Sequence, residues 1–339
     1  MSAATEAPAL ERERLLGLIN ASWTTQVIGA AVRLGLPAAL AGGARQVDAL
    51  AATTRADAPS LRRMLEALAT LGLVADDGSG SWALVGTGRL LLPNGDDSLA
   101  AWAELCAGPS WDVWRRLDES VRTGASQRRL EGFAHLNEDV AAAGLFNRAM
   151  SDLTAPIAVA LAKCIDLAPT ARIIDVGGGE GELLAGLLSR HSRASGHVFD
   201  LAHAADAAVR RFAERGLTAR ASFIAGDFFA AVPGDADVYL LKSVLHDWDD
   251  DDAVRILRSV AAAMSPSARL FVLERLRPEP AGFSAVDQAI ARSDLNMLVG
   301  TGGKERSEAT YRQLLESSGL QAQRTLALMP GYGAIEARL

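Results

Sequence analysis

The chain has 339 residues, of which 49% are hydrophobic and 22% are charged. This composition is typical of a folded globular protein and excludes a fibrous or disordered chain; at roughly 150 residues per domain the length indicates two domains. The formal net charge of −7 gives no excess of cations to neutralise phosphate groups, so we expect neither nucleic acid nor an anionic membrane as the main partner. A small molecule is the expected ligand.

The cysteines and the chain start indicate a reducing compartment. Cys106 and Cys164 stand far apart and outside any Cys/His cluster, so they predict neither a disulfide framework nor a structural zinc site. The first residues lack a cationic stretch followed by a long apolar core, and no later uninterrupted apolar run approaches the length of a membrane span. We therefore expect a cytoplasmic protein.

Residues 1–105 are expected to form a mainly helical domain. Within residues 11–34 large apolar side chains recur at helical spacing, which predicts an amphipathic helix whose apolar side needs a cover, from its own chain or from a second copy. Two further helices, over residues 47–53 and 60–71, and a β-hairpin over residues 73–85 are predicted next. This order is the winged-helix pattern.

A winged helix can bind DNA, which leaves a second class of function open, that of a cofactor-sensing regulator. Within residues 30–95, however, six arginines stand against five acidic residues. A nearly neutral segment is poorly suited to a DNA duplex. The sequence therefore favours homodimerisation as the role of this domain.

Residues 106–339 are expected to form the second domain. It opens with a helical segment whose aromatic side chains could line the pocket of a flat organic substrate, and its α/β core begins at about residue 155. From residue 172 short apolar runs alternate with helical ones, which predicts a Rossmann-like, doubly wound and mostly parallel sheet with helices on both faces. In such sheets ligands lie at the carboxyl ends of the strands, near the point where the strand order reverses.

The first strand of this core runs directly into a glycine-rich loop. Gly177 and Gly179 let the backbone turn sharply and let a ligand approach without a Cβ in the way. A dinucleotide fingerprint would place a third glycine at position 182, where this chain has Glu182. A carboxylate at this helix N-terminus would repel a pyrophosphate, so the loop is better suited to a cationic or zwitterionic ligand.

Two further strand ends add polar and aromatic groups. The second strand ends at Asp200, at the usual distance for an acid that accepts hydrogen bonds from ribose hydroxyls. The third ends at Gly226, Asp227 and Phe228, which offer a carboxylate for an adenine amine and a ring to lie on its face. Together the three strand ends predict an adenosine site without a phosphate site.

Four segments, Asp175–Gly181, Gly226–Phe228, Leu241–Trp248 and Gly302–Arg306, resemble those of the class I S-adenosylmethionine-dependent methyltransferases. The similarity is to the two-domain small-molecule O-methyltransferases of plants and of bacterial natural-product pathways, and it extends over nearly the whole chain. It implies a winged-helix-like dimerisation domain, S-adenosylmethionine as cofactor with S-adenosylhomocysteine as product, and an aromatic or polycyclic hydroxyl acceptor.

Carried over position by position, the resemblance implies three groups of site residues. His246 matches the general base, and Glu274 and Glu305 match the two acids that flank it. The expected cofactor contacts are Gly177, Gly179, Asp200, Asp227, Phe228 and Lys242, and the expected acceptor contacts are Asn147, Met150, Met297 and Asp247.

Methyl transfer independently needs these residue types. Displacement at a sulfonium methyl group mainly requires alignment of the reacting atoms. A hydroxyl acceptor must also lose its proton, which an imidazole with an ordinary pKa of about 6.5 is suited to take, and a carboxylate on the other ring nitrogen fixes the tautomer. Methylation of nitrogen or carbon by the same architecture remains open, because the cofactor site would be the same.

The acidic run Asp249 to Asp252 is a further candidate site. Clustered carboxylates are ligands for divalent cations, but acids in this position also cap and charge the N-terminus of a following helix. We expect the capping role and no metal ion.

Overall fold

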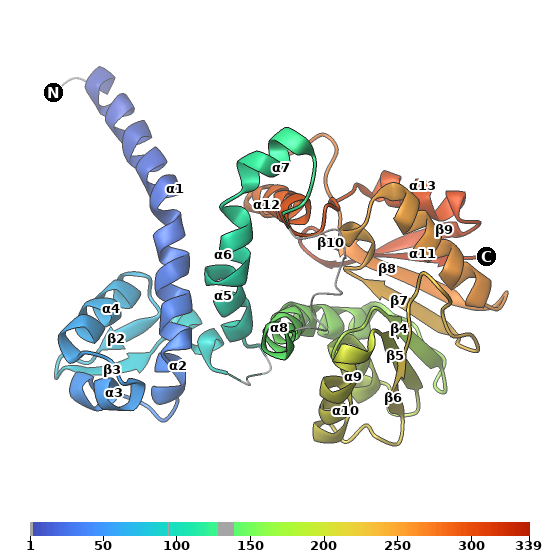
Figure 1. Cartoon of the computed structure of the whole chain (residues 1–339), viewed down its shortest axis with the longest axis horizontal. Coiled ribbons are helices and arrows are strands. Elements are labelled where there is room, and N and C mark those ends of the chain that lie inside the picture. The colour runs from blue at the N-terminus through green and yellow to red at the C-terminus, as the bar shows by residue number, and fades with distance from the viewer. Residues whose placement is uncertain (1–2, 94, 96, 128–138) are drawn as a thin grey trace. The chain divides into compact units, whose positions relative to one another are not determined.

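The computed structural model describes residues 3–93, 95, 97–127 and 139–339, and the chain divides into two compact units, Met1–Trp111 and Asp112–Leu339. Each unit has a hydrophobic core of its own. Figure 1 labels most of the helices and strands of both units.

The first unit packs helices and three short strands around a leucine-rich core. The strands pair antiparallel in the order β1–β3–β2, and the β2–β3 hairpin follows helices α3 and α4, as the sequence predicts. Helix α4 begins after Asp57, whose carboxylate accepts the N–H of Ser60 at 3.0 Å, the usual cap of a helix N-terminus. The elements are α1 (Ala3–Arg33), α2 (Leu36–Ala39), β1 (Arg45–Gln46), α3 (Val47–Thr54), α4 (Ala58–Thr70), β2 (Val74–Asp76), β3 (Ser81–Leu84), η1 (Gly86–Leu91) and α5 (Ala100–Ala107), with α6 (Pro109–Trp114) following.

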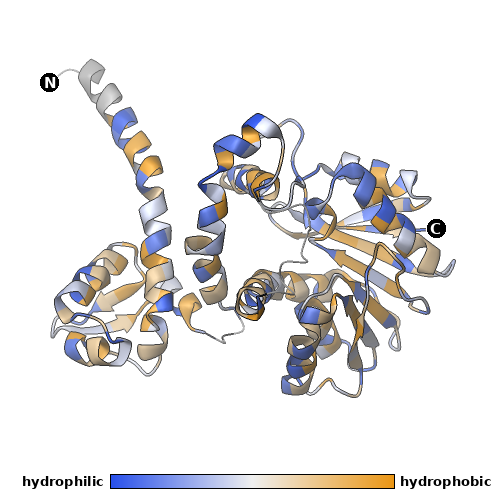
Figure 2. Cartoon of the chain, viewed as in Figure 1, coloured by the Kyte–Doolittle hydropathy of each residue, from blue (hydrophilic) through white to orange (hydrophobic). Residues whose placement is uncertain are grey.

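Helix α1 carries an exposed apolar stripe. Leu15, Leu18, Ile19 and Trp23 are between 58% and 68% exposed, and Figure 2 shows hydrophobic and hydrophilic residues alternating along the helix. Residues 10–33 are long and apolar enough to cross a membrane by length and composition alone. A soluble monomer rarely leaves such a stripe uncovered, so a second copy of the chain is the expected cover.

The stripe yields a prediction about assembly. We expect Leu18→Glu together with Trp23→Glu to convert a dimer into a folded monomer, because two charges would then lie in an apolar contact. Light scattering at micromolar concentration measures the mass, and circular dichroism checks the fold. Thr24→Glu, exposed on the opposite side of α1, is the matched control and should stay dimeric. A wild-type chain that scatters as a monomer would contradict the prediction.

The second unit is a seven-stranded sheet covered by helices on both faces, with strand order β6–β5–β4–β7–β8–β10–β9. The five neighbouring strands β6, β5, β4, β7 and β8 run parallel, which confirms the predicted mostly parallel sheet. Strand β10 pairs antiparallel with both β8 and β9. The order reverses between β4 and β7, so the carboxyl ends of these strands border the place where such sheets hold ligands. The strands are β4 (Arg172–Val176), β5 (Ser195–Asp200), β6 (Ala221–Ala225), β7 (Val238–Lys242), β8 (Arg269–Arg275), β9 (Gln321–Met329) and β10 (Tyr332–Arg338).

The two faces of this sheet bury separate cores, because successive side chains of a strand point to opposite faces. On β4, Ile173 packs in the cluster that α8, α9 and α10 cover, while Ile174 packs in the cluster that α11 and α13 cover. Packing on both faces of the sheet therefore fixes the positions of the strand ends. The helices are α7 (Leu117–Thr123), α8 (Val140–Cys164), α9 (Glu182–Arg190), α10 (Ala205–Glu214), α11 (Asp250–Ala263), α12 (Ala285–Gly300) and α13 (Glu308–Ser317), with the 3₁₀ turns η3 (Ala202–Ala204) and η4 (Leu245–Asp247).

The acidic run caps a helix, as the sequence predicts. Asp249 is the N-cap of α11, and its carboxylate accepts the N–H of Asp252 at 2.8 Å. Asp250 is occupied as well, because it pairs with Lys304 at 2.7 Å and with Arg306 at 2.8 Å. These carboxylates therefore stabilise the helix start and the loop beside it.

Candidate active site

The loop after β4 turns by means of glycines with left-handed backbone angles. Gly177, Gly179 and Gly181 have φ of 69°, 54° and 78°. A Cβ at Gly177 would lie 2.8 Å from Val244, and one at Gly181 would lie 2.8 Å from Phe212, so packing excludes a side chain at both positions. A Cβ at Gly179 would meet no atom of the described residues within 4 Å. The described part of the chain therefore leaves space beside the bare backbone of Gly179, as expected where a ligand approaches.

Asp200, at the end of β5, holds this loop in place. One carboxylate oxygen accepts the N–H of Gly179 at 2.7 Å and the other accepts the N–H of Leu201 at 2.6 Å. Loss of solvent raises the pKa of Asp200 against the effect of these two bonds. Each oxygen keeps a second lone pair, so the carboxylate still has capacity for the hydroxyl groups of a ligand.

Arg211 on α10 gathers the two carboxylates of the loop. Its guanidinium pairs with Glu180 at 2.7 Å and with Glu182, and it donates to the hydroxyl of Ser151 on α8 at 3.0 Å. Arg215 adds a second cation 3.3 Å from Glu182. The charge of Glu182 is thus compensated, and the repulsion of a pyrophosphate that the sequence predicts from this residue is wrong for this structure.

Aromatic rings gather beside the third strand end. Phe228, Phe229 and Trp248 pack edge to face, with centroids 4.7 to 6.0 Å apart. Asp227 accepts the N–H of Phe229 at 2.8 Å, which fixes the turn after β6. Asp227 itself is exposed and Phe228 is half-buried, so both remain accessible to a ligand.

A half-buried lysine and a buried aspartate occupy the adjacent ends of β7 and β4. The ammonium of Lys242 donates to the hydroxyl of Thr154 on α8 at 2.9 Å. Burial lowers the pKa of Lys242 against the attraction of Glu274 and Asp175. Asp175 is 1% exposed, neither of its oxygens has a hydrogen-bond partner among the described residues, and burial raises its pKa to about 7. Buried polar atoms without partners are rare, so we add Asp175 to the candidate ligand-binding residues.

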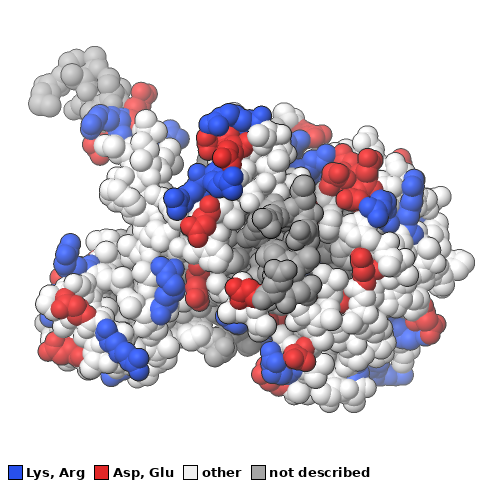
Figure 3. Space-filling view, viewed as in Figure 1, with Lys and Arg blue, Asp and Glu red and all other residues white. Residues whose placement is uncertain are grey.

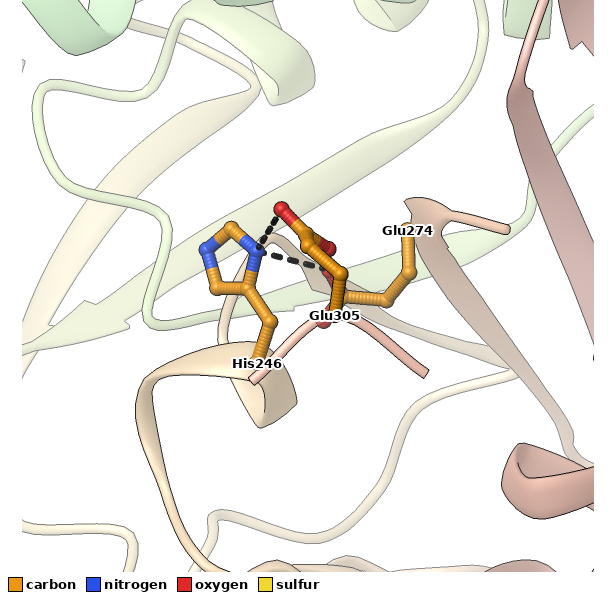
Figure 4. Close-up of side chains that lie close together, drawn as sticks. All are labelled: His246, Glu274 and Glu305. Atoms are coloured by element: carbon orange, nitrogen blue, oxygen red, sulfur yellow. Dashed lines mark ion pairs between the residues drawn. The ribbon is translucent and has the colours of Figure 1, made fainter. Parts of the chain in front are cut away.

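His246 lies in η4, the turn after β7, with two glutamates at one edge of its ring (Figure 4). Its Nδ1 is 3.4 Å from a carboxylate oxygen of Glu274 and 3.3 Å from one of Glu305. At the other edge, an oxygen of Asp247 stands 3.8 Å from Nε2. The structure thus brings the predicted base and both predicted acids together.

Both glutamates are held by other parts of the fold. Glu274, from β8, accepts the N–H groups of Val244 and Leu245 at 3.2 and 3.0 Å. Glu305, from the loop after α12, accepts the hydroxyl of Ser293 on α12 at 2.6 Å. The side chains of both glutamates are fully buried. Their carboxylates are therefore oriented before any ligand arrives.

These charges change the acid–base properties of the histidine. Burial opposes charge on the ring, but Glu274, Asp247 and Glu305 outweigh it and raise the pKa of His246 to about 10. Burial raises the pKa of Glu274 to about 7, whereas His246 and Ser293 hold the pKa of Glu305 below its ordinary value despite burial. The ordinary imidazole that the sequence suggests is thus replaced by a stronger base.

The residues expected to contact the acceptor lie on two helices. Asn147 and Met150 are on α8, and Met297 is on α12. Helix α12 reaches the histidine cluster through Ser293, and its Asn296 accepts the indole N–H of Trp114 at 2.9 Å. No short motif marks Thr154, Ser293, Arg211 or Asn296, so sequence analysis does not find them.

Comparison with known proteins identifies the family. Residues 114–321 match the O-methyltransferase domain, and residues 16–94 match the O-methyltransferase dimerisation domain. The chain is 39% identical over 328 residues to the mitomycin biosynthesis 6-O-methyltransferase of Streptomyces lavendulae, with 95% of this chain and 93% of that protein covered. The chain therefore belongs to the family of S-adenosylmethionine-dependent small-molecule O-methyltransferases, which confirms the resemblance seen in its sequence.

Two further relatives are relevant to the site. The crystal structure of an O-methyltransferase from neocarzinostatin biosynthesis, in complex with S-adenosylmethionine and 2-hydroxy-5-methyl naphthoic acid, matches with a TM-score of 0.75 at 33% identity, covering 93% of this chain and 95% of that one. The 8-amino-8-demethylriboflavin N,N-dimethyltransferase of Streptomyces davaonensis is 33% identical, with 86% of this chain and 85% of that protein covered. The dimerisation match includes most of the apolar stripe of α1, which supports a homodimer.

The arginine cluster behind the glycine loop yields a prediction about stability. Arg211→Met leaves Glu180 and Glu182, each no more than 8% exposed, without their main cation. Because breaking a buried ion pair costs about 3–5 kcal/mol and Arg215 offsets part of this, we expect the free energy of unfolding to fall by about 2–4 kcal/mol in urea titrations. Adding Glu180→Gln and Glu182→Gln should recover part of the loss. Arg210→Met, exposed on the same helix, is the control; equal stabilities of the two single variants would contradict the prediction.

Proposed function

We propose that this enzyme methylates a hydroxyl group of an aromatic or polycyclic small molecule in natural-product biosynthesis, with His246 as the general base. The observation that carries the proposal is the position of Nδ1 of His246 between the buried carboxylates of Glu274 and Glu305. The acceptor class is supported by the relatives named for mitomycin and by the naphthoic acid bound to the neocarzinostatin enzyme.

The proposal includes a cytoplasmic homodimer whose ligands are small molecules, without nucleic acid, membrane or metal. The net charge of −7 supports the exclusion of nucleic acid and of an anionic membrane, because phosphate-rich partners require a basic surface. Figure 3 shows Lys and Arg side chains interspersed with Asp and Glu over the viewed face.

The strand ends fit S-adenosylmethionine, which supplies an electrophilic methyl group when bound. Gly179 offers a bare backbone, Asp200 offers lone pairs for ribose hydroxyls, and Phe228 offers a ring for the adenine. The buried carboxylate of Asp175, which has no hydrogen-bond partner among the described residues, suits an ammonium group. Gly177, Asp227 and Lys242 complete the proposed cofactor contacts.

During methyl transfer the protein's own side chains must remove the proton of the acceptor hydroxyl group. With both neighbours of Nδ1 being carboxylates, the hydrogen of the neutral ring is assigned to Nδ1, which leaves the lone pair of Nε2 free to accept the proton of the hydroxyl group. Because the pKa of His246 is raised to about 10, this neutral form is the minor one at pH 7 and increases as the pH rises. The resulting imidazolium is stabilised by Glu274 and Glu305, and this makes His246 a stronger base than an isolated histidine. Asn147, Met150, Met297 and Asp247 are proposed to hold the acceptor beside Nε2.

The glycine loop gives a prediction for the cofactor. Gly179→Ala should weaken S-adenosylhomocysteine binding at least about tenfold, or roughly 1.4 kcal/mol, because its Cβ would occupy the space left for the ligand. Calorimetry measures the affinity, and NAD should give no comparable heat, because the chain lacks the third glycine of a dinucleotide fingerprint at position 182. Gly216→Ala is the matched control, since Gly216 has a similar φ of 65° and also nothing within 4 Å of a Cβ. Equal affinities of the two variants would move the cofactor away from Gly179.

The base assignment gives a prediction for turnover. His246→Ala should lower kcat by roughly 10²–10⁴-fold, the usual contribution of a positioned general base, and leave S-adenosylhomocysteine affinity nearly unchanged. Glu274→Gln and Glu305→Gln should each lose part of this rate. Combining either with His246→Ala should lose little more, because residues that act as a unit are not additive.

The pH dependence tests the same unit. The carboxylates raise the pKa of His246 to about 10, so the fraction of neutral imidazole, and with it kcat, should rise with pH from 7 toward 10. Glu305→Gln removes a charge that favours the imidazolium, so its rate profile should shift to lower pH and reach a lower maximum. A profile that this substitution does not move would contradict the coupling.

Methylation of nitrogen is the second candidate, and the riboflavin N,N-dimethyltransferase relative favours it. A neutral amine attacks without first losing a proton, so it needs alignment but no base. Near-normal turnover of His246→Ala at neutral pH would therefore make a nitrogen acceptor the leading function.

A further inference from the structure

The segment Gly302–Arg306 runs directly beside the turn that carries His246. Gly303 lies so close that a Cβ would stand 1.9 Å from the carbonyl oxygen of His246, and the N–H of Lys304 donates to that same carbonyl at 2.9 Å. The next residue, Glu305, sends its carboxylate to Nδ1. One short piece of backbone therefore supports the turn from one side and supplies a partner to the imidazole.

Arg306, the last residue of this segment, holds the same turn through its side chain, which is 1% exposed. One terminal nitrogen donates to the carbonyl of Leu245 at 2.8 Å, and the other donates to the carbonyl of Trp248 at 2.7 Å. These two carbonyls flank His246 along the chain. Nε pairs with Asp250 at the start of α11 at 2.8 Å.

The geometry suits arginine in particular. Within the turn, the carbonyl of Leu245 accepts the N–H of Trp248 at 3.3 Å, but a single 3₁₀ turn is weak by itself. The guanidinium uses the second lone pair of this carbonyl and also binds the carbonyl of Trp248, which follows the turn. A planar guanidinium presents several donors in a rigid fork, whereas an ammonium is a compact point charge. Moving the turn would remove both carbonyl partners of the buried Arg306 guanidinium. Leaving a buried charge without partners is costly.

We propose that Arg306 is a positioning residue for His246, holding the Leu245–Trp248 turn so that the imidazole stays between Glu274 and Glu305. The inference rests on the proposed role of His246 as the base. Arg306 touches no reacting atom. It acts by fixing where the ring stands.

The test is Arg306→Lys, which keeps a positive charge near Asp250 but lacks the fork that spans two carbonyls. We expect kcat to fall by about 10²-fold, the effect of a misplacement near 1 Å, with S-adenosylhomocysteine affinity within about twofold of wild type. Lys304→Met removes the other cation on Asp250 and leaves the carbonyl bonds intact, so it should keep most of the activity. Arg312→Met, which removes an ion pair with Glu308 on α13, controls for the loss of an arginine.

A second readout separates positioning from general stability. The groups that face His246 are Glu274 from β8, Asp247 from η4 and Glu305 from the loop after α12, with Lys242 of β7 acting on Glu274 and Asp247. A displaced ring moves away from the carboxylates, so the titration of His246, followed by NMR, should shift to lower pH in Arg306→Lys. Loss of stability alone would lower the melting temperature without moving this titration.

Gly303→Ala is an independent variant, because its Cβ would push the His246 carbonyl while Arg306 remains. It should show the same lower kcat and the same shifted titration. An unshifted His246 titration in both variants overturns the proposal, whatever happens to turnover. If the titration shifts but His246→Ala retains its activity, the positioning role stands and the base assignment fails.

Discussion

The parallel register of β4, β7 and β8 sets the distances in the active site. Val176 pairs with Leu241, and Lys242 pairs with Leu273. The glycine loop, Lys242 and Glu274 therefore lie together at the carboxyl ends of the parallel strands. A slip of one residue would turn Glu274 to the opposite face of β8 and away from the histidine turn. The hydrophobic cores on both faces of the sheet hold this register. The buried carboxylate of Glu274 therefore stays in a fixed position.

The sequence predicts the parallel strands and the loops at their carboxyl ends, because short local patterns mark them. Short apolar runs that end in glycine or aspartate mark β4, β5 and β6, and the glycines after β4 are required by backbone angles. The antiparallel hairpin of β9 and β10 is not predicted. Strand β9 is an exposed edge with many polar residues, so its sequence lacks the continuous apolar run of a central strand. Its pairing with β10 depends on contacts that no short pattern encodes.

Some features of the candidate site are likewise predicted by the sequence, and others depend on the tertiary fold. His246, Glu274 and Glu305 are recognisable from the segments around them, but the high pKa of the imidazole arises only when three carboxylates meet in space. Arg211 compensates two acids of the glycine loop from a different helix, which reverses the electrostatic argument that Glu182 suggests alone. Charge is therefore the property that sequence spacing predicts least well, since the partner of each charged group is set by the tertiary fold.

The helices proposed to surround the acceptor join the catalytic groups at few points. A hydroxyl of Thr154 connects α8 to Lys242, and a hydroxyl of Ser293 connects α12 to Glu305. Side chains on the other turns of these helices can be exchanged without breaking either link. If α8 and α12 line the acceptor as proposed, substitutions on their other turns would change the shape of the acceptor that is admitted while the links to Lys242 and Glu305 stay the same.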